Sequence, residues 1–126
     1  MQPVPMDFWF TMGSTYAYLA IMRLEEVTRP AGVAVGWRPF NFRTLLQERN
    51  FVPFPAGTAK TNYMWRDIER RALAYGFSAR LPAPYPIKDS ALANSVALLG
   101  MREGWGAAFV RTLRESTRQD QRSQQI

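Results

Sequence analysis

Ser14 is the residue whose type and position best fit chemistry in this chain. It stands where an aromatic-rich apolar run, Val4 to Thr11, gives way to a helical pattern that begins near Tyr16. Backbone N–H groups at a helix N-terminus have no partner within the helix, and the helix dipole favours negative charge there. A hydroxyl at that place can donate a hydrogen bond to a thiolate brought by a ligand and favour its ionised form. Serine is also among the commonest N-cap residues, so plain capping is the alternative.

The composition limits the chemistry that the chain can perform with its own side chains. Its 126 residues include no cysteine and no histidine. Disulfide exchange needs a thiolate, so the chain is not a dithiol oxidoreductase. Zinc sites of the Cys/His kind and a Ser-His-Asp triad within the chain are excluded too, and no metal site is expected.

The charge is strongly basic, with a formal net charge of +6. Such a protein can bind nucleic acid, acidic lipids or anionic small molecules. The arginines are scattered among helical repeats and do not form one block: Arg38, Arg43, Arg66, Arg70, Arg71, Arg102 and Arg111. This distribution favours solvated helix faces, leaves a site for an anionic ligand as the alternative, and argues against a nucleic-acid-binding surface.

The elements that must position Ser14 are predicted to form a strand–helix–strand unit. The first strand is the apolar run, and the helix extends from Tyr16 to a stop at Arg29-Pro30. Val33 to Phe42 is the second strand, with alternating apolar residues and a proline near its end. Two strands joined in this way form a βαβ unit, whose strands are parallel and whose crossover is right-handed.

The rest of the chain has a helical pattern only. The sequence predicts one or two helical turns at 44–48 and a loop at 49–58. A helix at 61–75, stopped by Gly76, carries Met64, Ile68, Ala72 and Tyr75 on one face, and its Asp67 precedes Arg71 by four residues, the spacing of an i,i+4 ion pair. An extended segment at 81–86 follows, then a helix capped by Asp89 or Ser90 that ends near Gly104, and a last helix with Trp105, Phe109 and Leu113. Residues 116–126 are almost entirely polar and are expected to be disordered. No uncharged stretch is long enough to span a bilayer, and the first six residues do not resemble a signal peptide, which predicts a cytoplasmic protein.

Several motifs resemble a known family. The run Asp7 to Ala20, DFWFTMGSTYAYLA, is similar to the opening of 2-hydroxychromene-2-carboxylate isomerases and kappa-class glutathione transferases, which belong to the DsbA-like thioredoxin superfamily. Trp37-Arg38-Pro39-Phe40 resembles the end of their second strand, and the likeness continues in order to about residue 113. The later matches are Lys60, Tyr63, Asp67, Arg71, Ala72, Gly76 and Tyr85-Pro86.

The resemblance implies an α/β architecture, an incomplete thioredoxin-like fold (βαβ) followed by an all-helical insert. The expected parts are 1–45 for the thioredoxin-like part, 46–115 for the insert and 116–126 for the polar tail. The implied activity is glutathione-dependent cis–trans isomerisation of a 2-hydroxychromene-2-carboxylate-like aromatic acid, or glutathione transfer of the kappa type. Family members continue with further strands, so a truncated, inactive fragment or a non-catalytic interaction module is the alternative.

The resemblance also implies a site. The family's serine after the first strand hydrogen-bonds the sulfur of glutathione and corresponds to Ser14. An asparagine and a lysine that contact glutathione correspond to Asn50 and Lys60, for which a turn residue and a solvated helix-start residue are the alternatives. Thr15 and Ala17 replace the family's usual proline and second serine. The expected partners are glutathione as cofactor and a small aromatic acid, without nucleic acid or membrane, and a homodimer is a further possibility.

Overall fold

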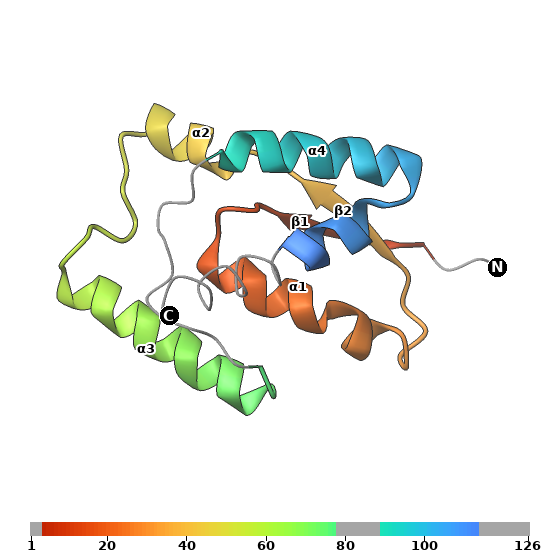
Figure 1. The fold of residues 1–126 in the computed structure, drawn as a ribbon, viewed down its shortest axis with the longest axis horizontal. Helices are drawn as coiled ribbons and strands as arrows, with labels where there is room; N and C mark the ends of the chain where they lie inside the picture. The colour runs from red at the N-terminus through yellow and green to blue at the C-terminus, as the bar shows by residue number, and fades with distance from the viewer. Residues whose placement is uncertain (1–3, 78–88, 114–126) are drawn as a thin grey trace, which may run out of the picture.

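Two parallel strands and the helices packed around them make up the part of the chain that the computed structural model describes, residues 4–77 and 89–113 (Figure 1). The elements follow one another as β1 (Met6–Phe10), α1 (Thr15–Thr28), β2 (Val35–Pro39), α2 (Phe42–Glu48), α3 (Ala59–Ala74) and α4 (Ser90–Glu103), and residues 106–113 are also helical. Within these ranges no helix is both long and apolar enough to cross a membrane.

The strand–helix–strand unit is present as the sequence predicts. β1 and β2 pair in parallel, with Met6 opposite Val35 and Phe10 opposite Pro39. Both strands are shorter than expected. At the start of β2 the Val33 N–H donates to the Thr28 carbonyl at the end of α1 (3.0 Å), so this residue belongs to the turn after the helix.

The main core lies on one face of this small sheet. Phe8 and Phe10 stack with ring centroids 5.6 Å apart, and both rings meet the edge of Trp37 on β2. Ala97 of α4 and Val110, both fully buried, cover this aromatic face. Since side chains alternate along a strand, Trp9 points to the opposite face, where 63% of it is exposed.

A second core joins α1 to α3, which lies against α1 and further from the strands (Figure 1). Its buried members are Leu19 of α1 and the residues Met64, Ile68 and Ala72 of α3. The spacing of four residues in α3 places these three side chains on one face, as the sequence predicts. The predicted stop is also confirmed. Gly76 has a φ of 79°, and the Phe77 N–H donates to the Ala72 carbonyl at 2.7 Å.

The helix starts differ from the sequence predictions in detail. α3 begins at Ala59, two residues early, because the Thr58 hydroxyl oxygen accepts a hydrogen bond from the Thr61 N–H. Asp89 occupies the N-cap position of α4 with a φ of 56°, but its side chain makes no capping hydrogen bond. α4 ends at Gly104, as expected. The predicted extended segment at 81–86 and the predicted disordered tail at 116–126 lie outside the described residues.

Gly100 is predicted to be intolerant of a side chain. An added Cβ would lie 2.6 Å from the Trp105 ring and 2.8 Å from the backbone of Gly106. Helix propensity favours alanine over glycine by about 1 kcal/mol, but overpacking costs about 1–3 kcal/mol. Gly100→Ala should therefore lower the free energy of unfolding measured in urea.

The matched control is Ser95→Ala on the exposed side of the same helix. That change should stay within about 0.5 kcal/mol of wild type. A Gly100→Ala chain more stable than wild type would contradict the close approach of the 106–113 helix to α4.

Candidate functional site

Ser14 lines a cavity of about 690 Å³. Small-molecule sites usually measure about 300–1,000 Å³, so the cavity has the size of a ligand site. It lies where α1 and α3 begin, between α2 and the 51–57 loop. The described lining residues are Thr11, Gly13, Ser14, Thr15, Tyr16, Phe42, Arg43, Leu46, Gln47, Phe51, Val52, Pro53, Phe54, Ala56, Gly57, Thr61, Asn62, Trp65 and Ser90.

Ser14 is the N-cap of α1. Its backbone is extended, with φ −88° and ψ 131°, and its Oγ accepts a hydrogen bond from the Ala17 N–H at 3.1 Å. Ser14 therefore caps the helix, as the alternative interpretation predicts. That hydrogen bond uses a lone pair of the oxygen, whereas donation to an anion would use the hydroxyl hydrogen. Capping the helix and binding an anion are compatible roles for Ser14.

The electrostatics of the cavity favour a negative ligand. Residues from the first turns of four helices line it: Ser14 and Thr15 at α1, Phe42 and Arg43 at α2, Thr61 and Asn62 at α3, and Ser90 at α4. The positive ends of the helix dipoles lie there. Arg43 is the one cationic side chain among the described lining residues, and none of those residues is Asp or Glu.

The remaining wall of the cavity is apolar and aromatic. Phe42, Phe51, Phe54 and Trp65 contribute rings to it, together with neighbouring aliphatic side chains and a proline. Aromatic rings pack well against a flat ring system in offset or edge arrangements. The cavity therefore combines polar groups near Ser14 with a surface suited to an aromatic ligand.

Asn50 and Lys60 lie at the border of this cavity and not among its lining residues. Asn50 is exposed in a left-handed turn after α2, with a φ of 50°, and its N–H donates to the Gln47 carbonyl. Lys60 is exposed on the first turn of α3, with its Nζ 5.2 Å from the centre of the Phe54 ring. The structure thus brings Ser14 into the cavity, and contacts of the other two with glutathione remain a prediction.

The polar lining residues that the sequence prediction missed are Arg43, Gln47 and Asn62. A signal for Arg43 exists in the topology. Arg43 follows the carboxyl end of β2 much as Ser14 follows the carboxyl end of β1, and the carboxyl ends of parallel strands lie at the same edge of a sheet. Ligands of open α/β sheets bind outside that edge. Because Arg43 is one of several scattered arginines, the sequence pattern did not distinguish it from helix-surface residues.

An exposed hydrogen bond ties the start of α1 to α3 beside the cavity. The Tyr16 hydroxyl donates to Oδ2 of Asp67 at 2.7 Å, and Arg71 donates to the same carboxylate. Burial, reinforced by the hydrogen bond to Asp67, raises the pKa of Tyr16 to about 12. The hydrogen bond from Tyr16, supported by Arg71, lowers the pKa of Asp67. The i,i+4 pair of Asp67 and Arg71 predicted from the sequence is confirmed.

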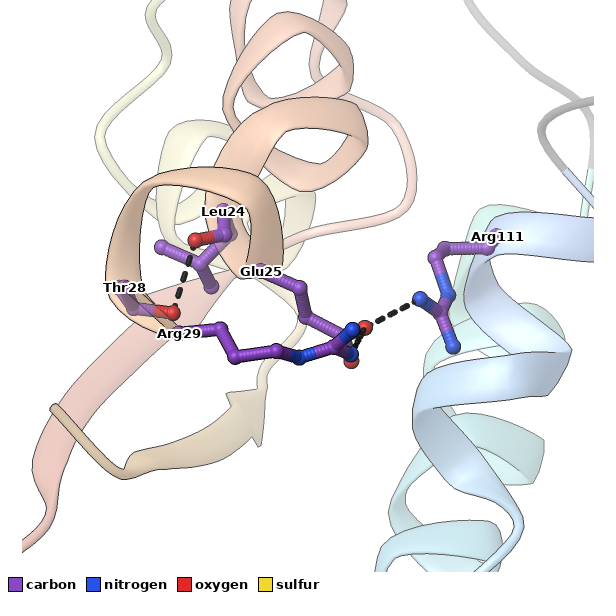
Figure 2. Close-up of polar contacts among 5 residues, drawn as sticks. All are labelled: Leu24, Glu25, Thr28, Arg29 and Arg111. Atoms are coloured by element: carbon purple, nitrogen blue, oxygen red, sulfur yellow. Dashed lines mark hydrogen bonds and ion pairs between the residues drawn. The ribbon is translucent and has the colours of Figure 1, made fainter. Parts of the chain in front are cut away.

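Away from the cavity, arginines serve as structural partners. Figure 2 shows the Glu25 carboxylate of α1 between Arg29, one turn later, and Arg111 of the 106–113 helix. The Thr28 hydroxyl in the same view donates to the Leu24 carbonyl at 2.8 Å. The end of α1 is thereby joined to the 106–113 helix through one carboxylate. This use of Arg111 agrees with the interpretation of most arginines as helix-surface residues.

The fold and the cavity at the start of α1 define a thioredoxin-like α/β protein. The sequence profile of the DSBA-like thioredoxin domain family matches residues 6–124, and the chain belongs to this family. The chain is also similar to a protein named 2-hydroxychromene-2-carboxylate isomerase from Sphingobium xenophagum, with 28% identity over 106 residues. That match covers 82% of this chain and 53% of the relative, so the chain spans about half the length of the relative. The family resemblance expected from the sequence is confirmed.

Alkaline pH is predicted to weaken the fold through Tyr16. The folded pKa of about 12 lies above the unfolded value of about 10, so the folded state favours the neutral phenol. The contribution of Tyr16 to the free energy of unfolding is complete below about pH 10 and is lost as the pH rises from about 10 to about 12. Urea midpoints measured from pH 8 to 11 should fall, and Tyr16→Phe should reduce the fall.

Tyr63→Phe is the control, because this tyrosine is 70% exposed. It should keep most of the pH dependence of the wild type, because Tyr63 is the smallest of the influences that raise the Tyr16 pKa. A Tyr16→Phe chain with the wild-type dependence on pH would exclude Tyr16 as the cause.

Proposed function

We propose that this chain binds glutathione in the cavity beside Ser14 and serves a glutathione-dependent isomerisation of a small aromatic acid. The observation that carries the proposal is a hydroxyl at the N-terminus of α1 in a cavity whose described lining includes a cation and no carboxylate. The name of the relative from Sphingobium xenophagum supports an aromatic carboxylate as the substrate class.

The residues present fit glutathione, a flexible peptide with two carboxylates and a thiol. Arg43 can bind a carboxylate through two parallel hydrogen bonds. The side chains of Gln47 and Asn62 can bind peptide groups, and the N–H groups at the helix starts favour an anion. When bound, glutathione supplies the thiol that this chain lacks, a nucleophile able to add reversibly to a double bond and permit its rotation.

Ser14 has a defined task in this proposal. Its hydroxyl donates a hydrogen bond to the sulfur, and the dipole of α1 adds to the same preference for negative charge. A free thiol has a pKa of about 8.5. Stabilisation of the thiolate lowers that value, so more of the ligand is ionised at neutral pH. The serine therefore orients and ionises the reactive group without becoming a nucleophile itself.

The aromatic wall has the complementary task of holding the second substrate. Phe42, Phe51 and Trp65 present apolar surface on the same cavity as Ser14. Lys60, placed over the ring of Phe54, and Asn50, beside Phe51, are then residues of the cavity rim. They would contact a ligand that extends out of the cavity.

Two other functions remain as alternatives. Glutathione transfer of the kappa type uses the same groups and differs in the second substrate, which would lose a leaving group. A non-catalytic interaction module is favoured by the open face of the sheet, where Trp9 is 63% exposed and meets the ring of Phe40. Glutathione binding separates this last function from the other two.

Glutathione binding is predicted to depend on the Ser14 hydroxyl. Calorimetry with millimolar glutathione should give heat for the wild type, and the absorbance of the bound thiolate should show a pKa below about 8.5. Ser14→Ala should weaken binding and raise that pKa, while costing about 1 kcal/mol of stability through loss of the cap.

Two further variants separate capping from binding. Ser14→Thr keeps both a cap and a hydroxyl and should retain binding, whereas Ser14→Asp keeps a cap but repels a thiolate. An absence of heat with the wild type would overturn the proposed function. Equal binding by Ser14→Asp and wild type would remove Ser14 from it.

Arg43 is predicted to contribute more to binding than Lys60. A charge-assisted hydrogen bond contributes about 1.5–3 kcal/mol, so Arg43→Gln should raise the dissociation constant for glutathione by about tenfold or more. Lys60→Gln should have a smaller effect.

Arg102→Gln removes the same charge from the exposed end of α4, outside the cavity lining, and is the control for net charge. If Arg102→Gln weakened binding as much as Arg43→Gln, a general electrostatic effect would replace the specific contact.

A further inference from the structure

Asn94 is a polar side chain buried in the middle of α4, with 4% of its surface exposed. Its Oδ1 accepts a hydrogen bond from the Met12 backbone N–H at 2.9 Å, and its Nδ2 donates to the Thr11 hydroxyl at 3.2 Å. Asparagine is a weak helix former, and burial of its amide costs free energy unless the amide is hydrogen-bonded. These two bonds offset that cost, and both go to the segment that ends β1.

The segment that Asn94 holds leads directly to Ser14. Thr11 and Met12 are themselves buried, at 8% and 3% exposure. Only Gly13 separates them from Ser14, and a Cβ at Gly13 would lie 3.5 Å from Cβ of Ser90. Ser90 and Asn94 are four residues apart on one face of α4. That face of α4 therefore supports the whole turn between β1 and α1.

The two hydrogen bonds also restrict the backbone where it turns from β1 into α1. Between Thr11 and Ser14 the chain leaves the sheet, and a long hydrogen bond joins the Ser14 N–H to the Thr11 carbonyl, at 3.4 Å. A backbone shift of about 1 Å at a reacting group is enough to cost a large part of its effect. The position of Ser14 thus depends on a helix that begins 76 residues later.

We propose that Asn94 is a positioning residue for Ser14, a role that rests on the proposed glutathione function. It does not line the cavity and acts through the Thr11 hydroxyl and the Met12 backbone N–H. Its amide fixes the turn so that the Ser14 hydroxyl and the first N–H groups of α1 keep one arrangement toward a bound thiol.

The test uses two substitutions at this position in the full chain. Asn94→Leu keeps the approximate volume and removes both hydrogen bonds. Asn94→Asp keeps an acceptor for the Met12 N–H, and its second oxygen can accept from the Thr11 hydroxyl in place of the amide's donation. Thr11→Val serves as a milder variant for hydrogen exchange, because it removes the bond from Nδ2 and keeps the bond to the Met12 N–H. Thr11 itself lines the cavity, so the thiol pKa is compared between the wild type and Asn94→Leu.

Two readouts are measured for each variant. Hydrogen exchange of the Met12 amide reports the turn without any ligand, and the pKa of the thiol of bound glutathione reports the arrangement at Ser14. Asn94→Leu is expected to expose the Met12 amide to exchange, weaken glutathione binding by about tenfold, and raise the thiol pKa. Asn94→Asp is expected to restore most of the protection of the Met12 amide, and Thr11→Val to give a smaller increase in its exchange.

A merely structural role would lower the urea midpoint and leave the thiol pKa of the folded protein unchanged. That result in Asn94→Leu overturns the proposal. If the wild type binds no glutathione, the proposed function fails and this role fails with it. Wild-type exchange of the Met12 amide in Asn94→Leu, with glutathione binding intact in the wild type, overturns the positioning role alone.

Discussion

An aromatic face on a sheet of only two strands has to be covered, and the arrangement of the described chain follows from that constraint. Phe8, Phe10 and Trp37 form one layer of rings, which would be costly to leave in water. A two-stranded sheet is marginal by itself. α4 and the 106–113 helix supply the missing layer through Ala97 and Val110. Because α4 must lie there, its N-terminal half also meets the turn that carries Ser14.

The arginines of the described chain occupy two kinds of place, in ion pairs with carboxylates and on the cavity. Arg38, Arg71 and Arg111 each pair with a carboxylate on another element or one turn away, and these pairs are partly exposed. Exposed pairs of this kind contribute little to stability. Arg43 lies on the cavity, whose described lining carries no acidic residue. A net charge of +6 is thus compatible with one local site for an anion.

The parts of the fold that depend on neighbouring residues could be predicted from the sequence. The βαβ unit, the apolar face of α3, and the stops at Gly76 and Gly104 follow from periodicity and from glycine's access to positive φ. The return of α4 onto the sheet could not be predicted, because no local pattern states which face of an amphipathic helix meets which partner. The boundary expected at residue 45 stays a prediction, although the main core joins residues from both sides of it.

In the candidate site too, a residue with a local sequence signal could be predicted, whereas a residue whose partners are distant in sequence could not. Ser14 could be found because an N-cap is a local feature. Asn50 and Lys60 came from a resemblance to the family. Asn50 lies in the turn after α2 with a positive φ and Lys60 on the first turn of α3, and neither is among the residues that line the cavity. Asn94 gave no signal at all. Its partners lie 82 and 83 residues earlier in the chain, and an isolated asparagine in a helical pattern indicates nothing about them.

That separation has a consequence for the order in which the protein is made. A chain emerging from the ribosome can pair β1 with β2 and form α1 once about the first forty residues are free, because these contacts are comparatively local. The turn before Ser14 gains its two side-chain hydrogen bonds only after Asn94 has been synthesised and a long loop has closed. The helix that Ser14 caps can therefore form early, whereas the turn before Ser14 reaches its final arrangement late. The cavity beside Ser14 is among the last features of the described chain to form.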